Sequence, residues 1–315
     1  MVDTLELELN RITYPGVNFL EETTCYLDEG SRGTHCYNDG GNITGRIGPL
    51  SVSINEFKVK IYKGSLCKWF LGSNLHTMTR KDIKNAIDKL SDTLHLPMKL
   101  AKVTRLDIAE NFIMKHPTDV YLNHLGEFNG LSRCEQPDGL LYKDNDGNME
   151  LCLYNKLREQ KKHREEIPSF YDGKNILRYE IRYKKAISKH FKVEEVTAGK
   201  IYNSLFYNNI IKDWEDEFMR IGRLNEICIN FSDIRGKKEL NRAGVLALLE
   251  KAGGQQAFYK MLKEAQKLNK LTRKQACDLR AYVDDICSQD QDVIVENDTI
   301  NELQNKVKEV ALFCR

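Results

Sequence analysis

Three segments of the chain alternate apolar and polar residues with the two-residue period of a β-strand. They are residues 103–112 (VTRLDIAENF), 151–156 (LCLYNK) and 176–185 (ILRYEIRYKK). Successive strand side chains point to opposite faces, so each segment predicts one apolar face and one polar face. The polar faces carry Arg105, Asp107 and Asn111; Cys152 and Tyr154, with Glu150 directly before that segment; and Arg178, Glu180, Arg182 and Lys184. We predict that these strands share a sheet and gather the polar residues on one surface.

Further strands are predicted from the same alternation. Residues 3–9 place Asp3 and three leucines on one side and Thr4, Glu6 and Glu8 on the other. This pattern is typical of a half-buried strand. Residues 28–50 are rich in glycine and polar residues, which predicts turns or an extended loop.

The segment 56–62 also alternates, with Phe57 expected inward and Lys60 outward. The Gly-Ser pair that follows it, and the apolar run 67–71, predict a hairpin. A second hairpin is predicted at DNDGN (144–148), which would deliver Tyr154.

Helices are predicted between and after these strands. Thr79 and Asp82 have the spacing of a capping box, and the helical pattern after them ends before Pro97. Residues 155–166 are typical of a charged, exposed helix, and after Gly236 the spacing is almost entirely helical.

The sequence therefore predicts an α+β fold, with a curved, mostly antiparallel sheet, helices on its apolar face and a helical carboxy-terminal region. We assign residues 1–235 to a catalytic domain and 236–315 to the helical region, which would bind DNA or a partner. Thr272 could begin the recognition helix of a helix-turn-helix, but a plain helical bundle explains the periodicity equally well.

Composition narrows the protein class. The chain has 315 residues, 30% charged and 41% hydrophobic, without an apolar run of membrane-spanning length. Its first residues are acidic where a signal peptide would be basic, which favours the cytoplasm and no membrane contact. Nine scattered cysteines without a CxxC pair argue against a zinc ribbon and favour reduced thiols.

Net charge is only +2, but the cations are unevenly distributed. Residues 174–192 contain seven lysines and arginines and one acid, Glu180. Such a basic stripe on strand-forming sequence is typical of phosphate binding, although a solvated charged face remains open. The candidate DNA-binding residues are Lys60, Arg105, Arg178, Arg182 and Lys184.

The polar faces offer a nucleophile and a cation site. Tyrosine has a reference pKa of about 10, so attack by Tyr154 on phosphorus requires neutralisation of charge. Asp107 and Glu180 are suitable ligands for Mg²⁺ or Mn²⁺, which prefer carboxylate oxygen. Lys156 would stabilise phenolate charge if the strand of Tyr154 continued. Since no two histidines are separated by one residue, a histidine-pair metal site is excluded.

The motifs together resemble the replication initiators of filamentous phages (the gene II/X proteins) and related rolling-circle plasmid initiators. The similar segments, spread over residues 1 to about 190, are MVDTLELEL, EFKVKIYKGS, VTRLDIAENF, LCLYNKLREQ and ILRYEIRYKK. The resemblance implies that Tyr154 is the nucleophile, Lys156 its motif neighbour, and Asp107 and Glu180 the metal-associated acids. It also implies nicking of one strand of an origin and closure of the displaced circle.

Three alternatives stay open at this point. A relaxase that nicks a transfer origin would use the same site. A DNA-binding regulator would use the basic face without Tyr154 or a metal, and a metal nuclease would use water as its nucleophile. The sequence also leaves open contacts with a host helicase or polymerase, and a homodimer.

Overall fold

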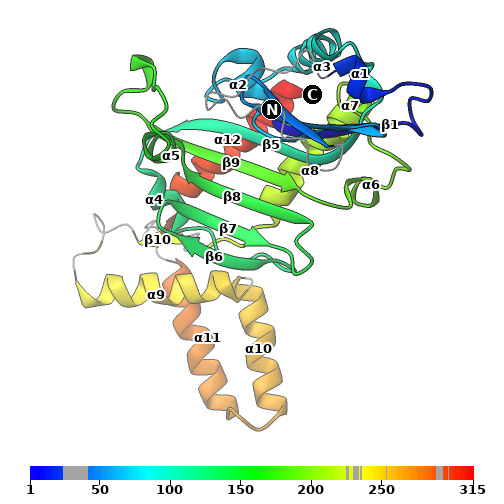
Figure 1. Ribbon diagram of the computed structural model, residues 1–315. Helices are drawn as coiled ribbons and strands as arrows, with labels where there is room; N and C mark the ends of the chain where they lie inside the picture. The colour runs from blue at the N-terminus through cyan, green and yellow to red at the C-terminus, as the bar shows by residue number, and fades with distance from the viewer. Residues whose placement is uncertain are drawn as a thin grey trace. The chain divides into compact units, whose positions relative to one another are not determined.

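The alternating segments form neighbouring strands of one nine-stranded antiparallel sheet (Figure 1). The computed structural model describes residues 1–23, 42–224, 227–229, 234, 236–252, 254–288, 294–296 and 298–315. Across the sheet the strand order is β2-β3-β4-β1-β5-β9-β8-β7-β6. The strands are β1 (Val2–Asn10), β2 (Ile43–Ile47), β3 (Leu50–Asn55), β4 (Lys58–Lys63), β5 (Lys102–Met114), β6 (Ser132–Gln136), β7 (Gly139–Lys143), β8 (Met149–Asn155) and β9 (Asn175–Tyr183).

The register confirms that the three key strands share a sheet and a polar face. Asp107 on β5 lies opposite Arg182 on β9, and Arg178 on β9 lies opposite Tyr154 on β8. Directly paired residues point to the same side of a sheet, so these four side chains share one face. The α+β class and the curved antiparallel sheet predicted from the sequence are therefore confirmed.

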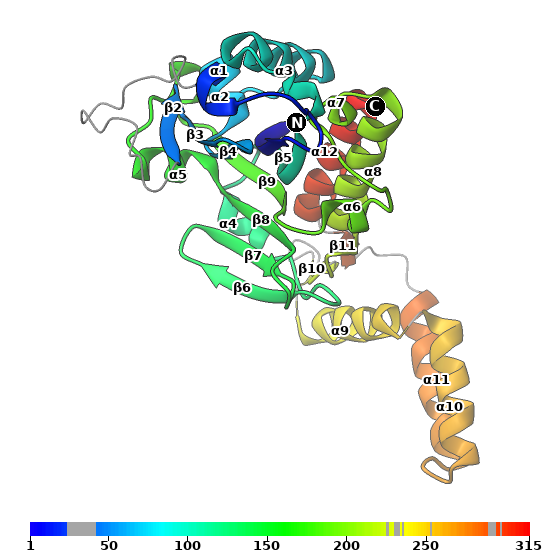
Figure 2. The ribbon, with the colours of Figure 1, turned by 45° about the vertical axis from the view of Figure 1, so that its right-hand side comes forward.

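Helices cover the apolar face of the sheet. In Figures 1 and 2, α8 (Ser204–Arg220) and α12 (Asp298–Cys314) lie side by side behind the strands. Trp214 of α8 is buried, with its ring 4.9 Å from that of Tyr179 and 6.4 Å from that of Phe112. The hydroxyl of Tyr179 also donates to the Trp214 carbonyl at 3.0 Å. Aromatic packing of this kind anchors the apolar face of β5 and β9, so their polar side chains lie on the opposite face.

The predicted capping box begins α3 (Arg80–Leu94). Thr79 and Asp82 exchange side-chain to backbone hydrogen bonds, and the helix buries Ile83, Ile87 and Leu90. The short helices around the sheet are α1 (Phe19–Thr23), α2 (Leu66–Leu71), α4 (Thr118–Leu122), α5 (Lys156–Lys162), α6 (Ile187–His190) and α7 (Ala198–Ile201). Two 3₁₀ turns lie at Met98–Leu100 and Ser169–Tyr171. No helix within the described ranges is long and apolar enough to cross a membrane.

Three local predictions were wrong. The apolar run 67–71 belongs to helix α2 instead of a strand, because Ser65 caps its start and Gly72 ends it in the left-handed region. Phe57 lies in the turn before β4 and is 59% exposed, in contact with the Arg11 guanidinium instead of the core. The loop predicted at 28–50 contains β2 and the start of β3; its residues 28–41 lie outside the described part of the chain.

The chain divides into two compact units, Met1–Arg223 with Glu302–Arg315, and Leu224–Asn301. The second unit contains the predicted helices α9 (Lys237–Lys251), α10 (Gln255–Lys267) and α11 (Arg273–Ser288), and the strands β10 (Ile227–Ile229) and β11 (Ile294–Glu296). Most of α12 belongs to the first unit by its contacts. The functional division at residue 235 stays a prediction.

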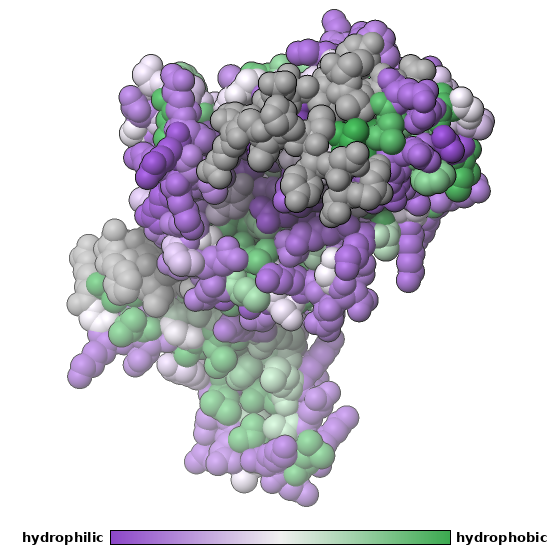
Figure 3. All heavy atoms as spheres, viewed as in Figure 1, coloured by the Kyte–Doolittle hydropathy of each residue, from purple (hydrophilic) through white to green (hydrophobic). Residues whose placement is uncertain are grey.

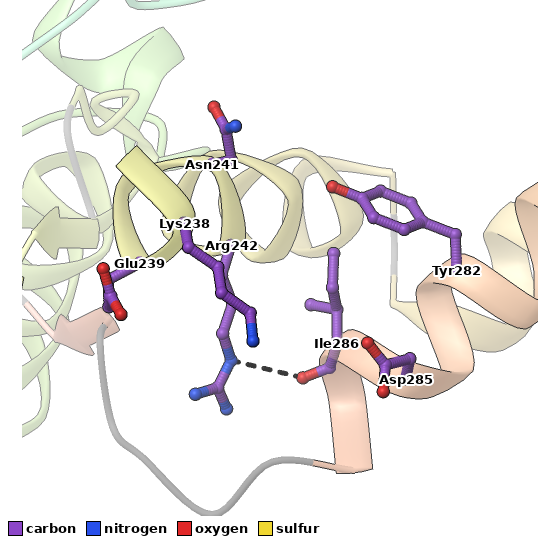
Figure 4. A pocket seen from close by; sticks show the side chains of 7 residues that line it. All are labelled: Lys238, Glu239, Asn241, Arg242, Tyr282, Asp285 and Ile286. Atoms are coloured by element: carbon purple, nitrogen blue, oxygen red, sulfur yellow. Dashed lines mark hydrogen bonds between the residues drawn. The ribbon is translucent and has the colours of Figure 1, made fainter. Parts of the chain in front are cut away.

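Inside the second unit, the three helices share a small apolar cluster. Leu249 of α9, Tyr259 and Leu262 of α10, and Val283 of α11 are buried together. A cavity of about 150 Å³ lies between α9 and α11, where Arg242 donates to the Ile286 carbonyl at 3.3 Å (Figure 4).

Candidate active site

The polar face of the sheet holds the residues predicted to act on DNA. Figure 3 looks onto this face of the sheet. The predicted residues and their elements are Lys60 (β4), Arg105 and Asp107 (β5), Tyr154 (β8), Arg178, Glu180 and Arg182 (β9), and Lys184 directly after β9.

A tight hairpin brings Tyr154 to this face. Its turn is closed by a hydrogen bond from the Asn148 backbone N–H to Asp144 at 2.7 Å, with Gly147 at positive φ. On the partner strand Gly139 lies opposite Tyr154, and a Cβ at residue 139 would lie 2.7 Å from the Tyr154 Cβ. Only glycine therefore allows β7 and β8 to approach this closely beside the tyrosine.

Tyr154 contacts one of the two predicted metal-associated acids. Its hydroxyl donates to Glu180 Oε2 at 3.0 Å. Burial and the negative charge of Glu180 raise the pKa of Tyr154 well above its usual value, and Arg178 only partly opposes them. The phenol is thus protonated in this state, and its activation requires a change in the charge around Glu180.

Glu180 is held as a carboxylate by two guanidinium groups. Arg182 Nε lies 2.8 Å from Glu180 Oε1, and Arg178 Nε lies 3.4 Å from Oε2. Burial disfavours the charged form of Glu180, but the two arginines outweigh burial and lower its pKa to about 2.

Arg178 is itself buried and fully engaged. It pairs with Asp3 at 3.0 Å and donates to the Asn74 carbonyl and to Asn111 Oδ1, each at 3.1 Å. This environment suits a group that positions Glu180 and Tyr154. Its predicted contact with DNA stays a prediction.

Asp107 is the second predicted acid, and it is also buried. Arg105 holds it through two hydrogen bonds, at 2.9 and 2.7 Å. Burial nevertheless raises the pKa of Asp107 to about 7, and the charge of Glu180 adds to this effect. The two carboxylates therefore interact electrostatically, and the pair with Arg105 does not offset the cost of burying Asp107 as an anion.

The carboxylates do not form a ready-made metal cage. Within the described residues, no group of three or more histidines, cysteines or acids is arranged to hold an ion. Asp107 and Glu180 are oxygen donors of the kind that Mg²⁺ prefers, but arginines now occupy their oxygens.

Lys156 lies on a helix and not on the strand from which its role was predicted. The strand of Tyr154 ends at Asn155, whose side chain caps α5, so Lys156 is the first residue of a helix. Its side chain is fully buried, and its ammonium bonds Glu159 at 2.6 Å. Burial and the charge of Arg178 lower the pKa of Lys156, while the charge of Glu159 contributes to the raised pKa of Tyr154. The predicted α5 is therefore not a merely exposed helix.

The remaining predicted DNA-binding residues lie further out on the same face. Lys184 bonds Glu150 at 2.7 Å, and Lys60 bonds Glu8 at 2.8 Å on the β4–β1 side of the sheet. Both side chains are about one-third exposed or more, so their ammonium groups are accessible to phosphate.

Some residues of the site were not predicted. Asp3 was placed with the leucines of its strand, but a register shift between Val2 and Thr4 lets it reach Arg178. The available sequence signal was the presence of the Asp3 carboxylate at a strand position otherwise occupied by leucines. The backbone contact of Asn74 has no sequence signal, and Gly139 carried none beyond its position before a strand.

The chain is similar in sequence to a known family of replication proteins. The family model that describes the N-terminal part of a phage replication-associated protein, the gene II product, matches residues 43–212, more than half of the chain. The chain belongs to this family of phage replication-associated proteins. The match covers Asp107, Tyr154 and Glu180, and it confirms the predicted resemblance to the gene II initiators. No curated protein matches the chain.

Proposed function

We propose that this family member is a site-specific DNA nickase and ligase that initiates rolling-circle replication through a covalent phosphotyrosine. One observation carries the proposal: the Tyr154 hydroxyl lies 3.0 Å from Glu180 on a sheet face dense with arginines. Membership in a family of phage replication-associated proteins supports replication as the context over transfer-origin nicking.

The proposed reaction exchanges one phosphoester bond for another. The Tyr154 oxygen forms a bond to phosphorus as one DNA ester oxygen leaves with a proton, and the phenol loses its own proton. The products are a phosphotyrosine on one DNA end and a free hydroxyl on the other, so rejoining needs no further energy source. Lys156 and Arg182 would stabilise negative charge that develops around the phosphate.

We also propose Mg²⁺ or Mn²⁺ as the cofactor, held by Asp107 and Glu180. The donor chemistry fits, because the mutual repulsion of the two carboxylates contributes to the raised pKa of Asp107 and a cation would relieve it. When bound, the ion would supply Lewis-acid charge to a non-bridging phosphate oxygen. Arg105 and Arg182 would exchange hydrogen bonds to admit it.

The protein's partner in this function is origin DNA, melted or single-stranded at the nick. Recruitment of a host helicase or polymerase, and a homodimer, stay predictions. The relaxase would share this chemistry and differ in its origin sequence.

The decisive experiment detects an SDS-stable protein–DNA adduct on origin DNA of the source replicon with Mg²⁺. Wild type should form the adduct, and Tyr154→Phe should not, while its DNA binding stays within a few-fold. Tyr62→Phe is the matched control, because it removes a hydroxyl from β4 on the same face. An adduct in Tyr154→Phe would move the nucleophile elsewhere, and cleavage without any adduct would favour a water-using nuclease. Binding without cleavage would favour a regulator.

A further inference from the structure

The tip of the hairpin formed by α10 and α11 concentrates cations that the sheet site does not use. Residues 260–274 contain six lysines and arginines and a single acid, Glu264. The next 25 residues, 275–299, contain seven acids and one arginine. Charge is therefore segregated along this stretch of the sequence: the two segments together are nearly neutral, but four of the seven acids follow the end of α11. The cations at the tip are Lys260, Lys263, Lys267, Lys270, Arg273 and Lys274, called here the tip cations.

All six tip cations are exposed, and none forms an ion pair within the described part of the chain. Lys260 and Lys267 lie four and three residues from Glu264, and Lys274 lies four residues from Asp278, but within the described ranges no ion pair forms at these spacings. Lys260, Lys263 and Lys267 lie along one side of α10 over about 10 Å, since each residue advances the helix by about 1.5 Å. Figures 1 and 2 both show the connecting loop at the end of the hairpin far from α9.

The position of two tip cations is unfavourable for helix stability. Arg273 and Lys274 occupy the first turn of α11, which has no acid. The amino end of a helix carries partial positive charge, so cations there are repelled. Thr272 and Gln275 nevertheless hold the turn in place, because each accepts a hydrogen bond from the backbone N–H of the other. A capped turn that keeps destabilising cations indicates a use outside the fold.

The apolar side of the hairpin is already occupied. Tyr259 and Leu262 of α10 pack on Val283 of α11, and Tyr259 also bonds Asp284 and lies under the Arg280 guanidinium. The tip cations are thus left on the outer surface of a hairpin whose shape is set by internal packing.

We propose that the tip cations bind the phosphate backbone of duplex DNA, as a second DNA contact separate from the Tyr154 site. The charge complements a polyanion, which offsets the cost of collecting unpaired cations. Duplex is favoured over single-stranded DNA because residues 260–274 contain no aromatic side chain, whereas single-strand sites combine cations with aromatic rings that stack on bases. The choice of DNA among duplex nucleic acids rests on the proposed function.

The proposal is tested with the full chain, a labelled duplex of arbitrary sequence and a series of salt concentrations. The tip variant combines Lys263→Ala, Lys267→Ala, Lys270→Ala and Lys274→Ala. A plot of log affinity against log salt concentration should have a slope that is shallower by about 3.6 in this variant. Four phosphate contacts are removed, and each contributes about 0.9 to the slope. Duplex affinity near 0.1 M salt should fall about tenfold or more.

A control variant with the same charge change separates contact from net charge. It combines Lys81→Ala, Lys99→Ala, Lys212→Ala and Lys308→Ala, four exposed lysines of the first unit on helices and turns outside the polar face. This variant should keep the wild-type slope. An equal loss in both variants, or an unchanged slope in the tip variant, would overturn the proposal; the second result would instead point to an acidic protein as the partner.

A third measurement distinguishes this inference from the proposed function. The tip variant should still form the Tyr154 adduct on a short single-stranded oligonucleotide at the wild-type rate, with an unchanged or raised melting temperature. If wild type forms no adduct, the nickase proposal fails. The duplex-binding measurement would still show whether the tip cations bind DNA. Loss of the adduct in a well-folded tip variant would overturn a separate role for the tip.

Discussion

The sheet face around Tyr154 and the tip of the α10–α11 hairpin both concentrate cations, but only the first neutralises them within the protein. Arg105, Arg178 and Arg182 each bond a carboxylate, whereas the tip cations bond none in the described ranges. Buried pairs fix geometry and shift pKa values, because charge acts strongly where water is excluded. Exposed unpaired cations attract a polyanion in a salt-dependent way. We infer that the first region performs chemistry and the second only binds.

The largest expected effect concerns the buried pair at the centre of the sheet face. Arg178→Met should destabilise the fold by about 3–5 kcal/mol, because it leaves Asp3 and Glu180 as buried charges with a lost partner. Lys267→Ala at the tip should change stability by no more than about 0.5 kcal/mol. Denaturant unfolding of both variants measures the difference. Equal effects would remove the distinction between the two regions.

The next effect concerns catalysis. Asp107→Asn and Glu180→Gln should each slow nicking about a hundredfold or more and shift its Mg²⁺ or Mn²⁺ dependence. Glu150→Gln is the matched control, since it removes an acid from the same face and should change the rate only about threefold or less. Full activity in EDTA would exclude the metal assignment for both acids.

A smaller effect should appear as a pH dependence of stability. The pKa of Asp107 is raised to about 7, so between about pH 4 and pH 7 the folded protein holds a proton that the unfolded chain has lost. The stability of wild type relative to Asp107→Asn should therefore fall as pH rises through this window. Unfolding free energies of both proteins at about pH 4.5 and pH 7.5 test this. A constant difference would show that Asp107 is ionised throughout.

The smallest effect concerns the outer cations of the sheet face. Lys184→Ala should weaken DNA binding and lower the salt slope by about 0.9, with little effect on stability, because its pair with Glu150 is partly exposed. Lys60→Ala should behave in the same way if the DNA extends across β1 to β4. Fluorescence anisotropy at several salt concentrations measures both, and an unchanged slope in either would place the DNA path elsewhere.

Much of the sheet site follows from strand periodicity. The two-residue period assigned Asp107, Tyr154 and Glu180 to polar faces, and the strand register confirms that they share one face of the sheet. The same reasoning was wrong for residues 67–71, because a short apolar run is compatible with a strand or a helix. Only the cap at Ser65 and the left-handed Gly72 decide between them.

The sequence by itself determined which residues share a strand face, where α3 begins and which hairpin carries Tyr154. These are local properties, set by the alternation of side chains and by turn and cap chemistry. Only the tertiary structure decided that Glu180 accepts the Tyr154 hydroxyl, that Asp3 reaches Arg178 and that Lys156 is buried against Glu159. These contacts depend on strand order, on a register shift and on packing between residues distant in the chain, which no local pattern encodes.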